Sequence, residues 1–315
     1  MLKYITRRLL IYIPLLFALT VISFIYVHLL PGDPVQAMVG QYAGPETVIK
    51  IRHELGLDRP LIDQYLSWMS GIFRGDFGIS FRTQKPITDY ILSRIPATLE
   101  LAFSSMLIAI LLSVPWGIMA GVKKNTKTDY FLSLLSLVGL STPSFWAGTI
   151  FMLIFAVGLK WFKTGGYVPF TEDPVQNLRL LFLPAFTLGF GCAPYLLRMT
   201  RSAVIETMQE PFITYARAKG IKDVTFHMRY VYRHAVCSII DALVLTFSGL
   251  LGGAMLVEEL FNFPGMGRVI IKGVMERDYF VVSTSILIFA GLYLLANLFS
   301  DVAHAILDPR IQLSK

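Results

Sequence analysis

The chain has 315 residues, 55% of them hydrophobic, and a mean hydropathy of +0.61. Several of its apolar runs reach about twenty residues, the length that crosses the hydrocarbon core of a bilayer. This composition excludes an ordinary soluble globular protein. The net charge is +7, and the excess of lysine and arginine lies in short segments between apolar runs. Such a distribution follows membrane topology, so it does not indicate a nucleic-acid partner.

The fold class predicted from these runs is all-α, a polytopic membrane protein with six transmembrane helices. Lysine and arginine near membrane ends are retained on the cytoplasmic side, which orients the helices. Both termini are expected inside, because the segments expected inside carry the positive excess and those expected outside are nearly neutral. The inner segments are 1–8, 122–129, 198–233 and 308–315, and the outer segments are 31–96, 159–177 and 262–280.

The chain opens with a cytoplasmic N-terminus, 1–8, followed by a first transmembrane helix, 9–30. At about 1.5 Å of rise per residue this run spans roughly 33 Å, enough for the hydrocarbon core. A secretory signal would be shorter and would end at small residues. This run ends instead at Leu30-Pro31-Gly32-Asp33-Pro34, so we interpret it as a retained helix.

Residues 31–96 form an extracytoplasmic segment that is too polar to cross the bilayer. Apolar residues recur in it at helical spacing, at Val48, Ile51 and Leu55 and again from Leu61 to Phe73, so we expect helices there. Residues 75–80 have the composition of a turn-rich connector. Two interpretations remain open: a small helical cap over the membrane helices, or a surface that receives a partner protein on the outer side.

Residues 97–307 are expected to form a core of five further helices. The second helix covers about 99–122 and contains Pro115, which membrane helices tolerate when neighbours satisfy the freed carbonyl. The third covers about 130–159 and is expected to bend at a Ser-Thr-Pro cluster, residues 141–143. The fourth covers about 178–197. The chain ends in a cytoplasmic C-terminus, 308–315.

The fifth helix, about 236–256, carries four small residues at four-residue spacings: Ser248, Gly249, Gly252 and Gly253. Small residues on one face allow a second helix to approach closely. The partner helix would belong either to this chain or to a second subunit, with the translocation path at that interface.

Acidic residues in the predicted spans are few, and each is expensive to insert: about 2.5–3.5 kcal/mol at a helix centre. Asp241, Glu258 and Asp301 are therefore candidate polar residues of a translocation path. The alternatives are an interhelical polar contact and a lining position that meets a cationic group of a substrate.

The polar segment 198–235 between the fourth and fifth helices is strongly basic. After Pro211 its composition permits a helix that would stop at Gly220, the residue type that most readily closes a helix in the left-handed conformation. We predict one or two short helices along the inner membrane face, offered to a soluble partner. The alternative is a basic loop that only sets topology.

Several motifs resemble the permease subunits of binding-protein-dependent ABC importers, in the dipeptide, oligopeptide and nickel branch. They are Leu30-Pro31-Gly32-Asp33-Pro34, Gly75-Asp76-Phe77-Gly78-Ile79-Ser80, Tyr215 to Gly220 with Arg233-His234-Ala235, Glu258 to Gly267, Arg277-Asp278-Tyr279 and Asp308-Pro309-Arg310. The chain departs from the family pattern at Ser238-Ile239-Ile240-Asp241, where the family usually has Asn-x-Leu-x-Pro. That departure puts the local helix geometry in question.

The resemblance implies the type I importer arrangement in a bacterial or archaeal cytoplasmic membrane. It implies a homologous second permease, two cytoplasmic ATPases holding ATP and Mg²⁺, and an extracytoplasmic substrate-binding protein. It also implies that the basic segment docks on the ATPase through Tyr215, Ala216, Arg217, Ala218, Lys219, Gly220, Arg233 and His234. Peptides are the expected substrates, with glutathione and nickel or other metal chelates as alternatives.

No catalytic or metal-binding motif is present in the sequence: it has neither a P-loop nor a His-Glu-x-x-His arrangement. We therefore expect no catalytic residue, no metal site and no cofactor on this chain, and ATPase activity on partner subunits. An ion-coupled secondary transporter is the remoter alternative. It would need carboxylates near the midplane and an internal repeat, and the sequence shows no such repeat.

Overall fold

The structure is a computed structural model of the chain, and it describes residues 2–29, 35, 44–54, 56–80 and 83–307. Among these residues every regular element is a helix, and a single isolated β-bridge joins Ile79 to Pro86. The all-α prediction is therefore confirmed. The chain separates into two compact units. Unit 1 comprises 99–263 and the last helix from Leu295, and unit 2 comprises 2–98 and 264–294.

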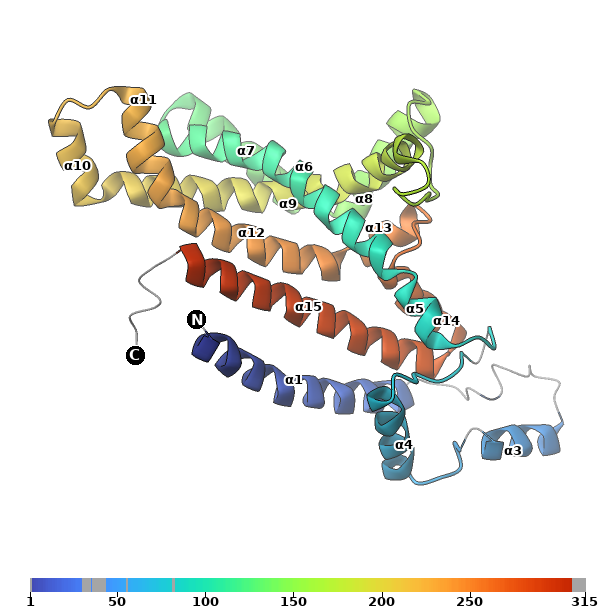
Figure 1. The fold of residues 1–315 in the computed structure, drawn as a ribbon. Coiled ribbons are helices and arrows are strands. Elements are labelled where there is room, and N and C mark those ends of the chain that lie inside the picture. Colours follow the sequence, from blue (N-terminus) through green and yellow to red (C-terminus); the bar gives the residue numbers. More distant parts are fainter. Residues whose placement is uncertain (1, 30–34, 36–43, 55, 81–82, 308–315) are drawn as a thin grey trace. The chain divides into compact units, whose positions relative to one another are not determined.

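Unit 1 contains the middle of the chain, shown in green to orange in Figure 1. Its elements are α6 (Ile95–Val122), α7 (Lys127–Ser141), α8 (Ser144–Phe151), η1 (a π-helix, Met152–Gly158), α9 (Pro174–Gln209), α10 (Pro211–Ala218), α11 (Asp223–Thr225), η2 (a π-helix, Phe226–Tyr232), α12 (Arg233–Gly253) and α13 (Met255–Leu260).

Helix α9 is the centre of unit 1 and packs against α7, α8, α10 and α12. Its first turn is capped by Asp173, whose carboxylate accepts hydrogen bonds from the backbone N–H groups of Val175 and Gln176. The helix continues to Gln209, so the first part of the predicted basic loop is helical, contrary to the predicted end at residue 197. No proline or glycine interrupts 198–209, and the helix stops only before Pro211.

The third predicted span is broken into two pieces. The segments Lys127–Ser141 and Ser144–Gly158 meet at an angle of 97°. The break falls at Thr142-Pro143, where Thr142 leaves the helical conformation, as expected for a residue that precedes proline. The bend predicted at the Ser-Thr-Pro cluster is therefore observed.

Close helix packing in unit 1 depends on glycine. A Cβ on Gly121 of α6 would lie 2.7 Å from the Val204 side chain of α9, and one on Gly189 of α9 would lie 2.7 Å from the Ser105 carbonyl of α6. A contact that short requires the neighbour to move, so the two helices approach as closely as their backbones allow.

Unit 2 contains α1 (Leu2–Leu29), the helices of the predicted external segment and the first part of α15 (Tyr279–Leu307). Between them lie α3 (Pro45–Glu54), α4 (Leu61–Phe73), α5 (Ile87–Leu92) and α14 (Met266–Glu276). The helical character expected for 31–96 holds for the residues described there. Ile87 and Ile91 of α5 pack against Met266 and Val269 of α14 in a buried apolar cluster.

Two of the sequence motifs meet inside unit 2. Ser80, at the end of the Gly-Asp-Phe-Gly-x-Ser run, donates a hydrogen bond to the Asp278 carboxylate over 2.6 Å, and both residues are buried. Asp278 also accepts from the Val281 backbone N–H at the start of α15, over 3.3 Å. This hydrogen bond therefore links two motifs that are 198 residues apart in the sequence.

Within the described part of the chain, four helical segments are long and apolar enough to cross a membrane: Ile87–Val122, Pro174–Gln209, Phe226–Gly252 and Tyr279–Leu298. The bent pair at Thr142-Pro143 supplies a fifth if it counts as one span. In α1 the apolar part, Leu10–Tyr26, is shorter. The count of six helices stays a prediction, and residues 30–34 and 308–315, with the motifs predicted there, lie outside the described residues.

Candidate functional site

The basic segment forms a short, well-bounded helix, α10, at one end of α9 and α12 (Figure 1). Pro211 occupies its first turn, where its missing N–H removes no helical hydrogen bond. Gly220 follows its C-terminal end with a φ of +68°, and its N–H donates to the Arg217 carbonyl over 3.0 Å. The predicted helix stop at Gly220 is therefore observed, with the expected left-handed geometry.

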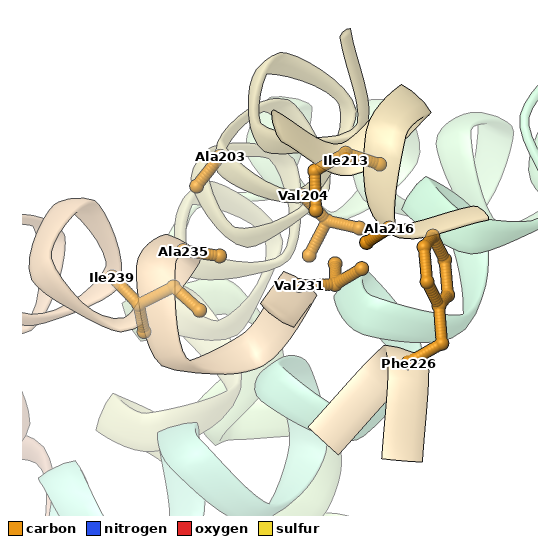
Figure 2. Close-up of a cluster of buried hydrophobic side chains, with 8 residues drawn as sticks. All are labelled: Ala203, Val204, Ile213, Ala216, Phe226, Val231, Ala235 and Ile239. Atoms are coloured by element: carbon orange, nitrogen blue, oxygen red, sulfur yellow. The ribbon is translucent and has the colours of Figure 1, made fainter. Parts of the chain in front are cut away.

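A buried apolar cluster fixes α10 to the rest of unit 1. Ile213 and Ala216 point from α10 towards Val204 of α9 and Val231 of η2 (Figure 2). Ile213 is 1% exposed, and Val204 and Val231 are fully buried. Because these side chains come from three elements, α10 is packed in place and does not hang as a free loop.

The opposite face of α10 is exposed and basic. Tyr215, Arg217, Ala218, Lys219 and Gly220 are all exposed. The Lys219 ammonium lies 4.7 Å from the centre of the Tyr215 ring, and the Arg217 guanidinium lies 5.2 Å from that of Phe226. These cation–π contacts restrain the positions of two positive charges on the exposed part of α10 and its C-terminal end.

The remaining residues predicted for this surface differ in exposure. Arg233 and His234 are exposed at the start of α12. The His234 ring packs 4.4 Å from that of Phe212 and is hydrogen-bonded through Nδ1 to the Tyr230 carbonyl over 2.7 Å, so it also braces α10 against α12. Ala216, in contrast, is 3% exposed, and it anchors the helix from inside.

An ion pair that the sequence analysis did not identify joins α7 to α9 at the same end of unit 1. The Nε and Nη2 atoms of Arg201 lie 2.5 and 2.9 Å from the two carboxylate oxygens of Asp129. Asp129 is 1% exposed and also accepts from the Asn125 backbone N–H over 2.9 Å. The partners are 72 positions apart, so no local pattern could have paired them.

At the other end of α6 a second polar contact secures the loop that precedes α9. The Tyr167 hydroxyl donates to a Glu100 carboxylate oxygen over 2.8 Å. Burial, and after it the neighbouring Glu100 carboxylate, raise the pKa of Tyr167 well above its ordinary value. The phenol therefore stays protonated and remains a hydrogen-bond donor.

The small residues of α12 do not share one environment. Ser248 is buried and donates to the Asn297 side chain of α15 over 3.0 Å. Gly249 and Gly252 are exposed, and a Cβ added to either would meet none of the described atoms within 4 Å. The exposure of Gly253 is outside the described part of the structure. Helix α12 therefore packs against α15 at Ser248 and leaves an open face at Gly249 and Gly252.

This open face extends along the whole of α12 and α13 as a stripe of exposed residues, which we call the α12 stripe. Its members recur every three or four residues, the spacing of one helix face, and are Ser238, Asp241, Leu245, Gly249, Gly252, Leu256 and Glu259. Helix α12 is regular through residues 238–241, where the chain departs from the resembled motif.

The three acidic candidates also differ in position. Asp241 is exposed on the α12 stripe. Glu258 is fully buried in α13, so its side chain lines no surface of unit 1 in this structure. Asp301 lies in α15, and its side chain is outside the described part. Among the described residues, no group of three His, Cys, Asp or Glu is placed to hold a metal ion.

Long apolar helices and a rigid, basic surface at one end define a multi-pass membrane permease. Comparison with known proteins gives the particular family. The chain belongs to the binding-protein-dependent transport system inner membrane components, whose model matches residues 113–313. The model for the N-terminal part of such membrane components matches residues 1–102. The chain is therefore an inner-membrane permease subunit of an ABC importer.

Curated relatives cover almost the whole chain. A putative peptide transport system permease protein of Brucella abortus (strain 2308) is 36% identical over 300 residues, 95% of this chain and 96% of the relative. The glutathione transport system permease protein GsiC of Escherichia coli (strain K12) is 36% identical over 312 residues, 99% of each chain.

The fold is similar to that of a chain of the MetNI methionine ABC transporter, solved in inward-facing conformations. The TM-score is 0.59 at 18% sequence identity, over 69% of this chain and 95% of the other. This similarity supports the permease fold of the chain.

The Asp129–Arg201 ion pair gives a direct test of the packing of α7 against α9. Replacing Asp129 with Ala leaves Arg201 without its partner. The Arg201 side chain is 27% exposed, so the cost should fall below about 3–5 kcal/mol, the cost of breaking a fully buried pair from one side. We expect the Asp129→Ala permease to unfold at a lower denaturant concentration, measured on the purified protein.

The matched control is the double variant Asp129→Leu with Arg201→Met, which removes both charges. It should recover most of the lost stability, because no unpaired charge remains buried. The cycle is completed by the single variants Asp129→Leu and Arg201→Met. If their two losses of stability add up to the loss of the double variant, the pair is not coupled.

Proposed function

We propose that this permease imports peptides and is driven by ATP hydrolysis on two cytoplasmic ATPase subunits, which grip the exposed face of α10. The observation that carries the proposal is the two-sided construction of that helix. Ile213 and Ala216 are buried in the chain's own core, while Tyr215, Arg217 and Lys219 are presented to a partner. A helix fixed on one face can transmit a push received on the other.

The proposed orientation follows from the position of the positive charges. The basic segment 198–235 and the lysines between α6 and α7 mark the cytoplasmic side under the positive-inside rule. Both termini would then also lie in the cytoplasm. The helices in 45–92 would lie outside, where an extracytoplasmic substrate-binding protein would deliver the substrate.

A homologous second permease would complete the translocation path, and the α12 stripe is the surface we assign to it. Gly249 and Gly252 leave room for a second helix or a passing solute. Asp241 would place a carboxylate on the same face, where it can meet the amino group of a peptide. The chain itself would contribute no covalent chemistry and bind no cofactor.

Peptides are favoured as substrates by the relatives, one of which is a putative peptide permease and another a glutathione permease. Glutathione is itself a short peptide with a free amino group, so both fit a path that offers a carboxylate. Nickel or other metal chelates remain the alternative within the same family.

The energy source is tested by uptake in intact cells. Uptake of a labelled dipeptide should continue when a proton uncoupler is added while ATP is maintained, and should stop when ATP is depleted with the proton gradient intact. The reverse pattern would identify an ion-coupled transporter and refute the proposal.

Gly220 tests the coupling surface. Its left-handed backbone costs an L-residue about 1–2 kcal/mol, and a β-branched side chain is the poorest fit. Such a cost corresponds to a factor of about five to thirty in an equilibrium. We expect Gly220→Val to reduce both uptake and co-purification of the ATPases by about that factor while the protein stays in the membrane.

The matched control is Gly220→Asn, because asparagine adopts the left-handed conformation more readily and the site has free space around it. This variant should retain most of the activity. A Gly220→Val permease that binds the ATPases and transports normally would refute the docking role of α10.

Asp241 tests the transport path. Asp241→Asn keeps the size of the side chain and removes its charge, so uptake of a peptide with a free amino group should fall several-fold while an N-acetylated peptide is less affected. The control is Glu172→Gln, which removes an exposed carboxylate from the loop before α9. Equal effects on both peptides would leave Asp241 with a structural role only.

A further inference from the structure

An apolar groove of 380 Å³ lies on unit 1, and its lining includes no residue of α10 or of the α12 stripe. Three helices line it. The lining includes Leu112 and Trp116 of α6, Phe131 and Leu135 of α7, and Pro194 and Leu197 of α9. At its far end α7 crosses α9 closely, where a Cβ on Gly139 would lie 2.4 Å from Pro194.

The lining offers almost nothing to a polar ligand. Its two hydroxyl groups are already committed to their own helix: Ser136 donates to the Ser133 carbonyl over 2.8 Å and Thr142 to the Val138 carbonyl over 2.9 Å. A peptide would leave its backbone groups without partners here, at a substantial cost in free energy. The groove therefore suits a hydrocarbon chain.

The near end of the groove, in contrast, is marked by lysines. Lys123 follows Trp116 by seven residues, in the turn directly after α6, and Lys127 precedes Phe131 by four residues at the start of α7. These spacings place both lysines close to the groove-lining direction of the two helices. Along the helix axis these spacings correspond to about 10 and 6 Å. Both lysines are exposed.

The turn that carries these lysines is held in place. Asn125 has a φ of +64°, and its N–H donates to the Asp129 carboxylate, the group that also binds Arg201. Asp129 is 1% exposed, so its charge is directed into the protein and does not cancel the lysines at the surface. Two exposed positive charges therefore lie beyond one end of an apolar groove whose lining holds no charged residue.

We propose that this groove binds one anionic glycerophospholipid of the bilayer, with an acyl chain along Trp116 and Phe131 and the phosphate between Lys123 and Lys127. The depth of the lysines fits, because a phosphate lies at the membrane surface and the chain continues into the apolar region. Basic pockets at the cytoplasmic ends of membrane helices are suited to such head groups. The volume falls within the range of small-molecule sites, about 300–1,000 Å³.

The proposal predicts lipid selectivity that depends on two lysines and on nothing else nearby. The probe is Trp116, made the only tryptophan of the chain by Trp68→Phe, Trp146→Phe and Trp161→Phe. The full-length permease is placed in nanodiscs that contain a brominated phospholipid, whose bromine quenches nearby tryptophan fluorescence. Brominated phosphatidylglycerol should quench Trp116 at a several-fold lower mole fraction than brominated phosphatidylcholine, since each lysine contributes a factor of about five.

The Lys123→Gln/Lys127→Gln variant should lose this preference. The control, Lys124→Gln/Lys163→Gln, removes the same charge from two exposed lysines off the groove and should keep it. Equal quenching by the two lipids, or an unchanged preference in the first variant, would overturn the proposal. Absence of quenching by both would show that protein covers the groove, and would overturn it as well.

If the Lys123→Gln/Lys127→Gln variant does not fold, the salt dependence of quenching in the protein that keeps both lysines still tests the proposal. The selectivity for brominated phosphatidylglycerol should fall as salt is raised from 0.05 to about 1 M, because exposed charges are screened over a few ångströms at that concentration. Selectivity that is insensitive to salt would contradict a phosphate held by exposed lysines.

Discussion

The proposed coupling depends on one packing interaction above the others: the side of α10 that faces the chain must be held firmly. Ile213 and Ala216 provide this by packing against Val204 of α9 and Val231 of η2. Apolar side chains in such a cluster are close-packed and yield little to a load. A displacement applied to α10 is therefore passed to the helices on either side of it, and α9 is the helix around which unit 1 is assembled.

The Asp129–Arg201 pair extends this connection to α7. Arg201 lies three residues before Val204 in α9, so the ion pair and the apolar cluster occupy the same stretch of that helix. Asp129 in turn holds the turn between α6 and α7 through Asn125. The basic end of unit 1 is consequently one mechanical assembly of α6, α7, α9, α10 and α12. The exposed surfaces of unit 1 differ in character. The surface of α10 is basic, the groove is apolar, and the α12 stripe mixes small, acidic and leucine side chains.

Much of this could be predicted from the sequence because the signals are local. Pro211 and Gly220 bound α10 through their own backbone preferences, and Thr142-Pro143 bends the third span for the same reason. The predicted end of α9 at residue 197 is wrong because charged residues do not by themselves end a helix, and Arg198 to Gln209 contains no residue that stops one. Contacts between distant residues could not be predicted. Asp129 with Arg201, and Ser80 with Asp278, are joined only by the fold.

We propose above that an ATPase subunit binds the exposed face of α10. A photo-crosslinking amino acid at Tyr215, which is 64% exposed, tests it directly in the assembled transporter. The account predicts a crosslink to the ATPase subunit from this position and none from Phe73, which is 83% exposed in α4. A transporter that is active yet forms no ATPase crosslink through residue 215 would contradict the account.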